Sequence, residues 1–122
     1  MKTIIKTIGV LGFLLLTITV NAQKKPYYTE QEEVIEAAYK QLDYSMKEGL
    51  LYEWKTERNP TGSYTMRLTI KGKGEVVTVS TVDRKEGDIP TQNSLKNFIK
   101  TYRFPFKMPK NKSYQFVYEF KF

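Results

Sequence analysis

Hydrophobic residues recur along the chain with two periods, and the first of them predicts a helix. Between Thr29 and Gly49 the apolar positions fall three and four residues apart. The run T-E-Q-E has the form of a capping box, with Thr29 as N-cap and Glu32 at the third helical position, and Gly49 is a typical C-terminal stop. The residues expected on the buried stripe of this helix are Val34, Ile35, Ala38, Tyr39, Leu42 and Met46.

The second period, of two residues, predicts a hairpin. From Ser63 to Lys71 apolar and polar residues alternate, as in a strand with one buried face. The turn K-G-K-G at Lys71–Gly74 joins this strand to the β-branched run Glu75–Val82, and Asp83–Asp88 is typical of a polar loop. The side chains expected to point inward from the first strand are Tyr64, Met66, Leu68 and Ile70.

The segment Leu50–Glu57 favours a further strand, because Leu50, Tyr52 and Trp54 alternate with other residues. A second helix is predicted to begin at Pro90 or Thr91 and to end before Pro105, which cannot continue a helix. Its apolar positions are Leu95, Phe98, Ile99 and Tyr102.

The last ten residues, Ser113–Phe122, predict a strand with one aromatic face. Together these elements predict an α+β fold, with an antiparallel sheet of three to four strands packed by two helices. We expect the aromatic face to pack in the core of the domain. The rival interpretation is the last strand of a transmembrane barrel, which needs at least about 8 strands, more than a chain of this length can supply. The signature of base-stacking sheets, a basic residue followed by G-F/Y-G/A-F, is absent, so no nucleic-acid partner is expected.

Residues 1–22 have the order of a secretion signal: Lys2 and Lys6, then the apolar run Thr7–Val20, then small residues up to Ala22. We therefore expect a cleaved signal peptide and one domain over residues 23–122, periplasmic or secreted in a bacterial envelope. The alternative is an uncleaved signal that anchors the chain in the inner membrane, and only then is membrane contact expected. Removal of Lys2 and Lys6 would lower the net charge from +7 to +5.

The composition excludes most catalytic chemistry. The chain has no His and no Cys, so it lacks the commonest general base, the thiol nucleophile and the usual zinc ligands. No serine lies in a G-x-S-x-G or S-x-x-K motif, and the acidic residues lack the spacing of a calcium loop. We expect no enzyme, no catalytic residue, no metal and no cofactor.

Residues 62–122 resemble the C-terminal domain of TonB and its relatives, the periplasmic energy transducers of the TonB/TolA type. The resemblance rests on G-S-Y-T-M-R-L-T-I for a first strand, K-G-E-V-V-T-V for a second, and a helix followed by an aromatic-Arg-aromatic signature and a final alternating strand. The signature residues are Tyr102, Arg103, Phe104 and Pro105. The resemblance covers half the chain and implies a sheet whose first strand is central, flanked by the second and the last.

The resemblance also implies a function, which is binding of an extended segment of an envelope protein, such as an outer-membrane receptor, as an added strand on the last strand's edge. The stretch between the leader and the first helix is too short to cross a periplasm, so force transduction is not expected. If Leu50–Glu57 pairs with the last strand, this edge is already capped. The partner-binding residues carried over are Tyr114, Gln115, Val117, Glu119 and Lys121.

The net positive charge leaves a second function open. The protein is then a structural or accessory envelope component that binds acidic lipid or polymer through a basic face. The two functions differ in their response to salt, because screening weakens charge binding far more than backbone pairing.

Overall fold

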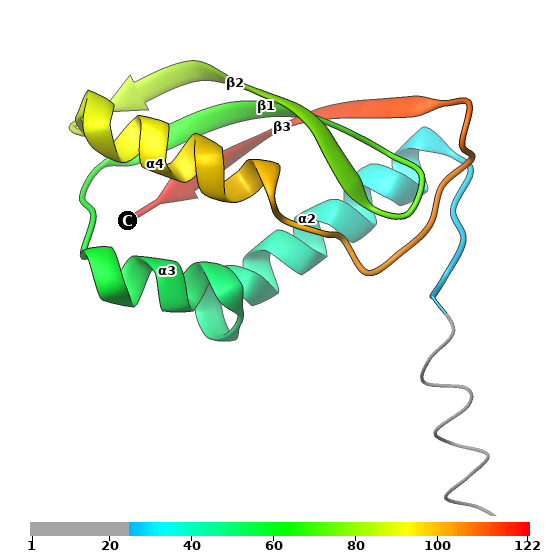
Figure 1. The fold of residues 1–122 in the computed structure, drawn as a ribbon, viewed down its shortest axis with the longest axis horizontal. Coiled ribbons are helices and arrows are strands. Elements are labelled where there is room, and N and C mark those ends of the chain that lie inside the picture. The colour runs from blue at the N-terminus through cyan, green and yellow to red at the C-terminus, as the bar shows by residue number, and fades with distance from the viewer. Residues whose placement is uncertain (1–24) are drawn as a thin grey trace, which may run out of the picture.

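The protein is a two-layer α+β structure in which three helices cover one face of an antiparallel sheet (Figure 1). The computed structural model describes residues 25–122, so the expected signal peptide lies outside the described residues. Within that range the α+β class and the antiparallel sheet are confirmed, with one helix more than expected. The elements are α2 (Gln31–Glu48), α3 (Leu50–Arg58), β1 (Ser63–Lys71), β2 (Glu75–Lys85), α4 (Ile89–Lys100) and β3 (Ser113–Lys121).

Helix α2 begins one residue later than its capping pattern predicts. The N-cap is Glu30, whose backbone N–H bonds Glu33 Oε1 at 3.4 Å and whose carbonyl accepts the first helical bond, from Val34. The carbonyl of Thr29 lies outside the helix and accepts the Tyr114 hydroxyl of β3 at 2.6 Å. Gly49 ends the helix as predicted.

Residues 50–57 form a helix, so the prediction of a strand there is wrong. The buried side chains of α3 are Leu51 and Trp54, three residues apart, while the alternating Leu50 and Tyr52 are 56% and 45% exposed. Tertiary contacts decide this, because the Trp54 ring lies 6.0 Å from Phe98 and 5.6 Å from Phe122. The segment does not pair with β3, and the hypothesis that it caps the sheet edge is also wrong.

The strand order is β2-β1-β3, with the long central strand β1 between two edges. The inward face predicted for β1 is confirmed, since all four side chains from Tyr64 to Ile70 are fully buried. The β1–β3 pairing runs without interruption from Ser63↔Lys121 to Lys71↔Ser113. The two strands therefore form one regular ladder.

Strand β2 is longer and less regular than predicted. It continues through Lys85 into the segment expected to be a loop, and its register against β1 shifts twice. The residues left without a partner at these shifts are Val77 and Val82, 45% and 47% exposed. Bulges of this kind are common on edge strands, where they disfavour pairing with another strand.

Helix α4 starts at Ile89, one residue before the predicted Pro90. Its N-cap is Asp88, whose Oδ1 accepts the Thr91 backbone N–H at 2.8 Å. The hydrogen bonds from Thr91, assisted by the nearby positive charge of Arg84, hold the Asp88 pKa below its usual range. The inward positions predicted for this helix are confirmed at Leu95 and Ile99.

The Asp88 cap predicts a pH dependence of stability. Because its pKa is lower in the folded than in the unfolded state, the stabilisation is present above the unfolded value and is lost as pH falls through the folded value. We expect Asp88→Ala to lower the Tm near neutral pH, with the difference from the wild type disappearing in acid. Thermal unfolding followed by circular dichroism across this pH range tests it, and a difference that persists undiminished in acid would contradict the assignment.

One hydrophobic core lies between the sheet and the helices. It includes the aromatic residues of β3, the inward side of β1 and the buried stripes of α2 and α4. The fully buried large side chains of this core include Tyr64, Tyr114, Phe104, Phe120, Leu42, Leu51 and Leu68.

No helix in residues 25–122 has the length and apolar character needed to span a bilayer.

Candidate functional site

The site predicted from the sequence lies on β3, and within residues 25–122 no strand pairs with the outer edge of β3. Along the strand the prediction that the aromatic stripe faces the core is confirmed for Tyr114, Phe116 and Phe120, which are buried toward the helices, whereas Tyr118 is only partly buried. The non-aromatic residues that alternate with them are exposed on the sheet face that no helix covers (Figure 1). These are Gln115, Val117, Glu119 and Lys121.

The backbone groups on the outer edge of β3, which faces away from β1, belong to these same non-aromatic residues. The Val117 carbonyl accepts the Tyr39 hydroxyl of α2 at 2.6 Å, and the Phe122 N–H donates inward to Gly62 at 2.9 Å. Since the hydrogen-bonding sides of an antiparallel edge strand alternate from residue to residue, the odd-numbered positions present their N–H and C=O groups outward. The open edge therefore offers the backbone of Gln115, Val117 and Glu119.

Helix α2 runs beside this edge and is joined to it by two tyrosines. The Tyr39 ring packs edge-on against Phe116 and Tyr118, with centroids 5.9 and 5.7 Å away. The Tyr118 hydroxyl donates to Asp43 Oδ1 at 2.5 Å. Partial burial, together with this hydrogen bond, raises the Tyr118 pKa well above its ordinary value, so the hydroxyl remains protonated and donating.

A groove of about 430 Å³ follows the second half of the edge. One wall comes from α2 and the other from β3. The groove is open at the surface, and it combines one apolar side chain, Met46, with charges of both signs. The residues that line it are Asp43, Met46, Lys47, Tyr118, Glu119 and Lys121.

On the exposed sheet face the β3 side chains are held in place by β1. Gln115 Nε2 donates to Thr69 Oγ1 at 3.2 Å, and Glu119 Oε2 accepts the Ser63 hydroxyl at 2.8 Å. Lys121 lies 3.8 Å from Glu119, as an exposed ion pair that contributes little to stability. These contacts fix the strand without using its outer backbone edge.

The signature residues pack rather than form a site. Tyr102 and Phe104 are buried with ring centroids 5.1 Å apart, and the Tyr102 hydroxyl accepts Gln41 Nε2 at 3.0 Å. Arg103 and Pro105, between and after them, are exposed. The signature therefore places the chain leaving α4 back against the core.

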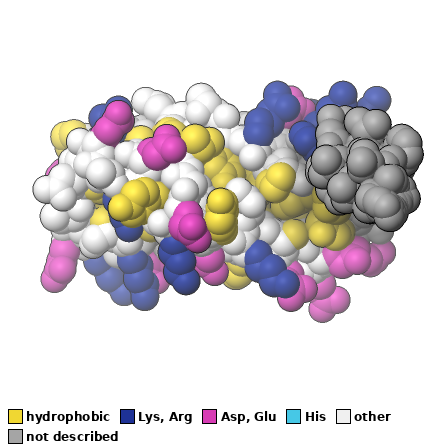
Figure 2. Space-filling view, turned by 90° about the horizontal axis from the view of Figure 1, so that it is seen from below, with side chains coloured by type: hydrophobic (Ala, Val, Ile, Leu, Met, Phe, Trp, Pro, Cys, Tyr) yellow, Lys and Arg dark blue, Asp and Glu magenta, His cyan; other side chains and the backbone are white. Residues whose placement is uncertain are grey.

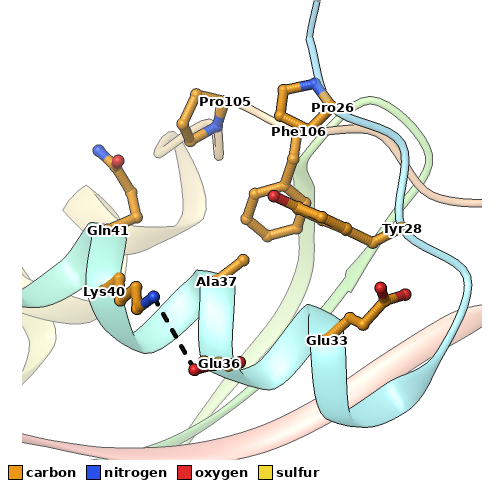
Figure 3. A pocket seen from close by; sticks show the side chains of 9 residues that line it. All are labelled: Pro26, Tyr28, Glu33, Glu36, Ala37, Lys40, Gln41, Pro105 and Phe106. Carbon is orange, nitrogen blue, oxygen red and sulfur yellow. Dashed lines mark ion pairs between the residues drawn. The ribbon is translucent and has the colours of Figure 1, made fainter.

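A second groove, of about 380 Å³, lies between α2 and the connector that follows α4 (Figure 3). The rings of Tyr28 and Phe106, 5.4 Å apart, form one side, and Ala37 lies beneath them. The α2 side carries the exposed pair Glu36–Lys40 at 3.8 Å. No buried polar side chain points into this groove, and we assign it no ligand.

Polar side chains other than tyrosine are rare in the core of residues 25–122. Apart from the buried tyrosines, Ser45 is the one buried residue with a polar side chain in residues 25–122, and its Oγ accepts the Leu51 N–H at the junction of α2 and α3. Within the same range no three carboxylates come together in a way that could hold a metal ion.

Sequence reasoning missed the α2 side of the groove. Tyr39 and Met46 were assigned to the buried stripe, yet Tyr39 is 40% exposed. Asp43 and Lys47 follow Tyr39 at four-residue intervals, which places them on the same side of the helix. That spacing was visible, but the position of the helix relative to β3 was not.

Comparisons of this chain with protein-family models, with curated proteins and with solved structures found no match.

Proposed function

We propose that this protein is a binding module of the bacterial envelope, periplasmic or secreted, that takes up an extended segment of another envelope protein as a fourth strand beside β3. It acts by binding and performs no catalysis. The observation that carries the proposal is the regular nine-residue edge of β3, which no strand pairs on its outer side within residues 25–122, where the Tyr39 hydroxyl bonds the Val117 carbonyl and a groove lies against α2.

The order of elements supports the resemblance on which this proposal draws. After Gly62 come two strands, a helix and a last strand, and the first strand is central in the sheet, as the TonB C-terminal fold implies. Helix α3 packs elsewhere and leaves the β3 edge open. Residues 50–57 belong to this helix and add no strand to the sheet.

The contrast between the two sheet edges supports β3 as the binding edge. Strand β2 carries two bulges, whereas β3 is uninterrupted and presents N–H and C=O groups at regular intervals. An added strand would bond this backbone and place alternate side chains over the groove beside Met46. It would also replace the Tyr39 hydroxyl as the donor to the Val117 carbonyl.

Val117→Pro tests the proposal, because proline removes an N–H that points to the open edge and leaves the β1–β3 ladder intact. We expect the affinity for captured envelope proteins to fall at least about tenfold. This corresponds to the loss of roughly one backbone hydrogen bond, together with a clash between the proline ring and the incoming strand. The measurement is a pull-down from an envelope fraction, followed by titration of the captured protein.

Two control variants distinguish the effect of the backbone N–H from that of the side chain, and binding at the β3 edge from binding at the β2 edge. Val117→Ala keeps the backbone donor and should bind within about threefold of the wild type, as expected for a rim side chain. Val82→Pro places the same substitution at a bulge on the opposite edge and should bind normally. If Val117→Pro folds and still captures the same proteins, strand addition at β3 is wrong.

A further inference from the structure

Exposed basic side chains gather at the end of the sheet where the β1–β2 hairpin turns. A concavity of about 490 Å³ there contains four cations and one carboxylate, Glu75. Ion pairs within residues 25–122 are confined to Lys40–Glu36 and Lys121–Glu119, so these cations are not paired with carboxylates there. The basic end is defined by Lys71, Lys73, Arg103, Lys107 and Lys110.

The basic end is built on a fixed backbone. The hairpin is joined to the connector after α4 by two hydrogen bonds, Phe104 N–H to Gly74 O at 2.9 Å and Met108 N–H to Gly72 O at 2.6 Å. The contact is so close that a Cβ on Gly74 would lie 2.1 Å from the Phe104 carbonyl oxygen. Like charges held together on one support repel each other, and an anion bound among them relieves that repulsion.

The chain also enters the fold at the basic end (Figure 1). The Lys107 N–H donates to Pro26 O at 2.8 Å, and the Tyr28 N–H donates to Lys107 O at 2.9 Å. Between these residues Tyr27 is 59% exposed, and tyrosine is a side chain that favours membrane interfaces. The residues upstream contain the apolar run Thr7–Val20, which is expected to enter a membrane during export.

The charges that Figure 2 shows at this end are partly separated by sign. In Figure 2 dark blue side chains gather along one margin of the end at which the chain enters, and acidic side chains gather along the other. The acidic first turn of α2, with Glu32 and Glu33, belongs to a different element from the hairpin and connector. One side of this end is therefore suited to an anionic surface.

We propose that the basic end docks onto the phosphate groups of anionic phospholipids at a membrane surface. The occupant is a bilayer, because the five cations come from two segments spread across one end and are accompanied by the exposed Tyr27. Lys and Arg near an anionic membrane each strengthen binding about fivefold, and screening by salt removes most of that gain. The β3 edge remains free to bind a protein segment while the hairpin end contacts lipid.

Vesicle co-sedimentation tests the proposal with a chain that begins at Gln23, which contains every described element. We expect binding to vesicles that contain phosphatidylglycerol, much weaker binding to phosphatidylcholine alone, and a steep loss of binding with salt. Lys73→Gln combined with Lys110→Gln should weaken binding about 25-fold, from two cations at about fivefold each. Lys73→Arg with Lys110→Arg should restore it.

A matched double variant controls for net charge. Lys55→Gln with Lys85→Gln removes the same charge, with Lys85 at the Ser63 end of the sheet, and should change binding by no more than about threefold. Equal losses for the two double variants, or equal binding to neutral and anionic vesicles, would overturn the proposal. So would a soluble polyanion such as polyglutamate that binds with the same dependence on Lys73 and Lys110 while anionic vesicles do not.

The lipid result is independent of the proposed function at β3. Lys73 and Lys110 lie outside both β1 and β3, so their substitution leaves the β3 edge unchanged. Val117→Pro should retain vesicle binding in full.

Discussion

Phe104→Ala is expected to lower the free energy of unfolding by about 3–5 kcal/mol, the range for deleting a fully buried phenyl ring. The Phe104 side chain is 0% exposed, and its ring has three aromatic neighbours, at centroid distances of 5.1 Å (Tyr102), 5.6 Å (Phe106) and 6.2 Å (Phe116). No single neighbour can move into the space without leaving the others. Urea unfolding followed by circular dichroism measures the loss.

The size of this effect matters because domains of this size have a total stability of only about 5–15 kcal/mol. Phe104→Leu keeps most of the apolar volume and should give a smaller loss, which makes the series measurable even if the alanine variant unfolds. Val77→Ala, at an exposed bulge, should change stability by less than about 0.5 kcal/mol. A loss below about 1 kcal/mol for Phe104→Ala would show that the ring is not at the centre of the core.

Gly74→Ala is expected to cost at least about 2 kcal/mol, because two penalties act together. The residue has φ +90°, a conformation that a side chain strains, and its Cβ would lie 2.1 Å from the backbone oxygen of Phe104. The connector would have to move away, and the Phe104 N–H to Gly74 O hydrogen bond would be lost with it. Urea unfolding again gives the measurement.

Gly72→Ala is the matched control in the same turn. Its φ is +60°, within the left-handed region, and a Cβ there would meet only the flexible Glu75 carboxylate, at 3.3 Å. We expect it to cost about 1 kcal/mol. Equal costs for the two substitutions would mean that backbone strain alone matters and that the hairpin does not pack tightly on the connector.

The ends of helices and strands can be predicted from the sequence only where the local signals are unambiguous. The T-E-Q-E-E run holds two overlapping capping frames, and α2 uses the later one, with Glu30 as N-cap, while the Thr29 carbonyl accepts the Tyr114 hydroxyl. In β2 the bulges at Val77 and Val82 break the alternation of inward and outward residues. The alternation therefore predicts no clear buried face for β2 and a strand that ends at Val82 rather than Lys85.

The error at residues 50–57 has the same origin. Leu50, Tyr52 and Trp54 alternate, while Leu51 and Trp54 are three apart, so the segment satisfied both periods. Only the pocket that receives Trp54, between Phe98 and Phe122, decides between them. With the helix in place, the edge of β3 is left open.

The sequence by itself determined the strands β1 and β3 and the face that each buries, because a period of two carries that information locally. It also determined the residue types available for chemistry, with no His and no Cys. Only the tertiary structure decided which edge lacks a partner strand within residues 25–122, that α2 lines it with Tyr39 and Asp43, and that four cations line one concavity at the hairpin end. These depend on contacts between residues far apart in the chain, and such contacts leave no periodic signal in the sequence.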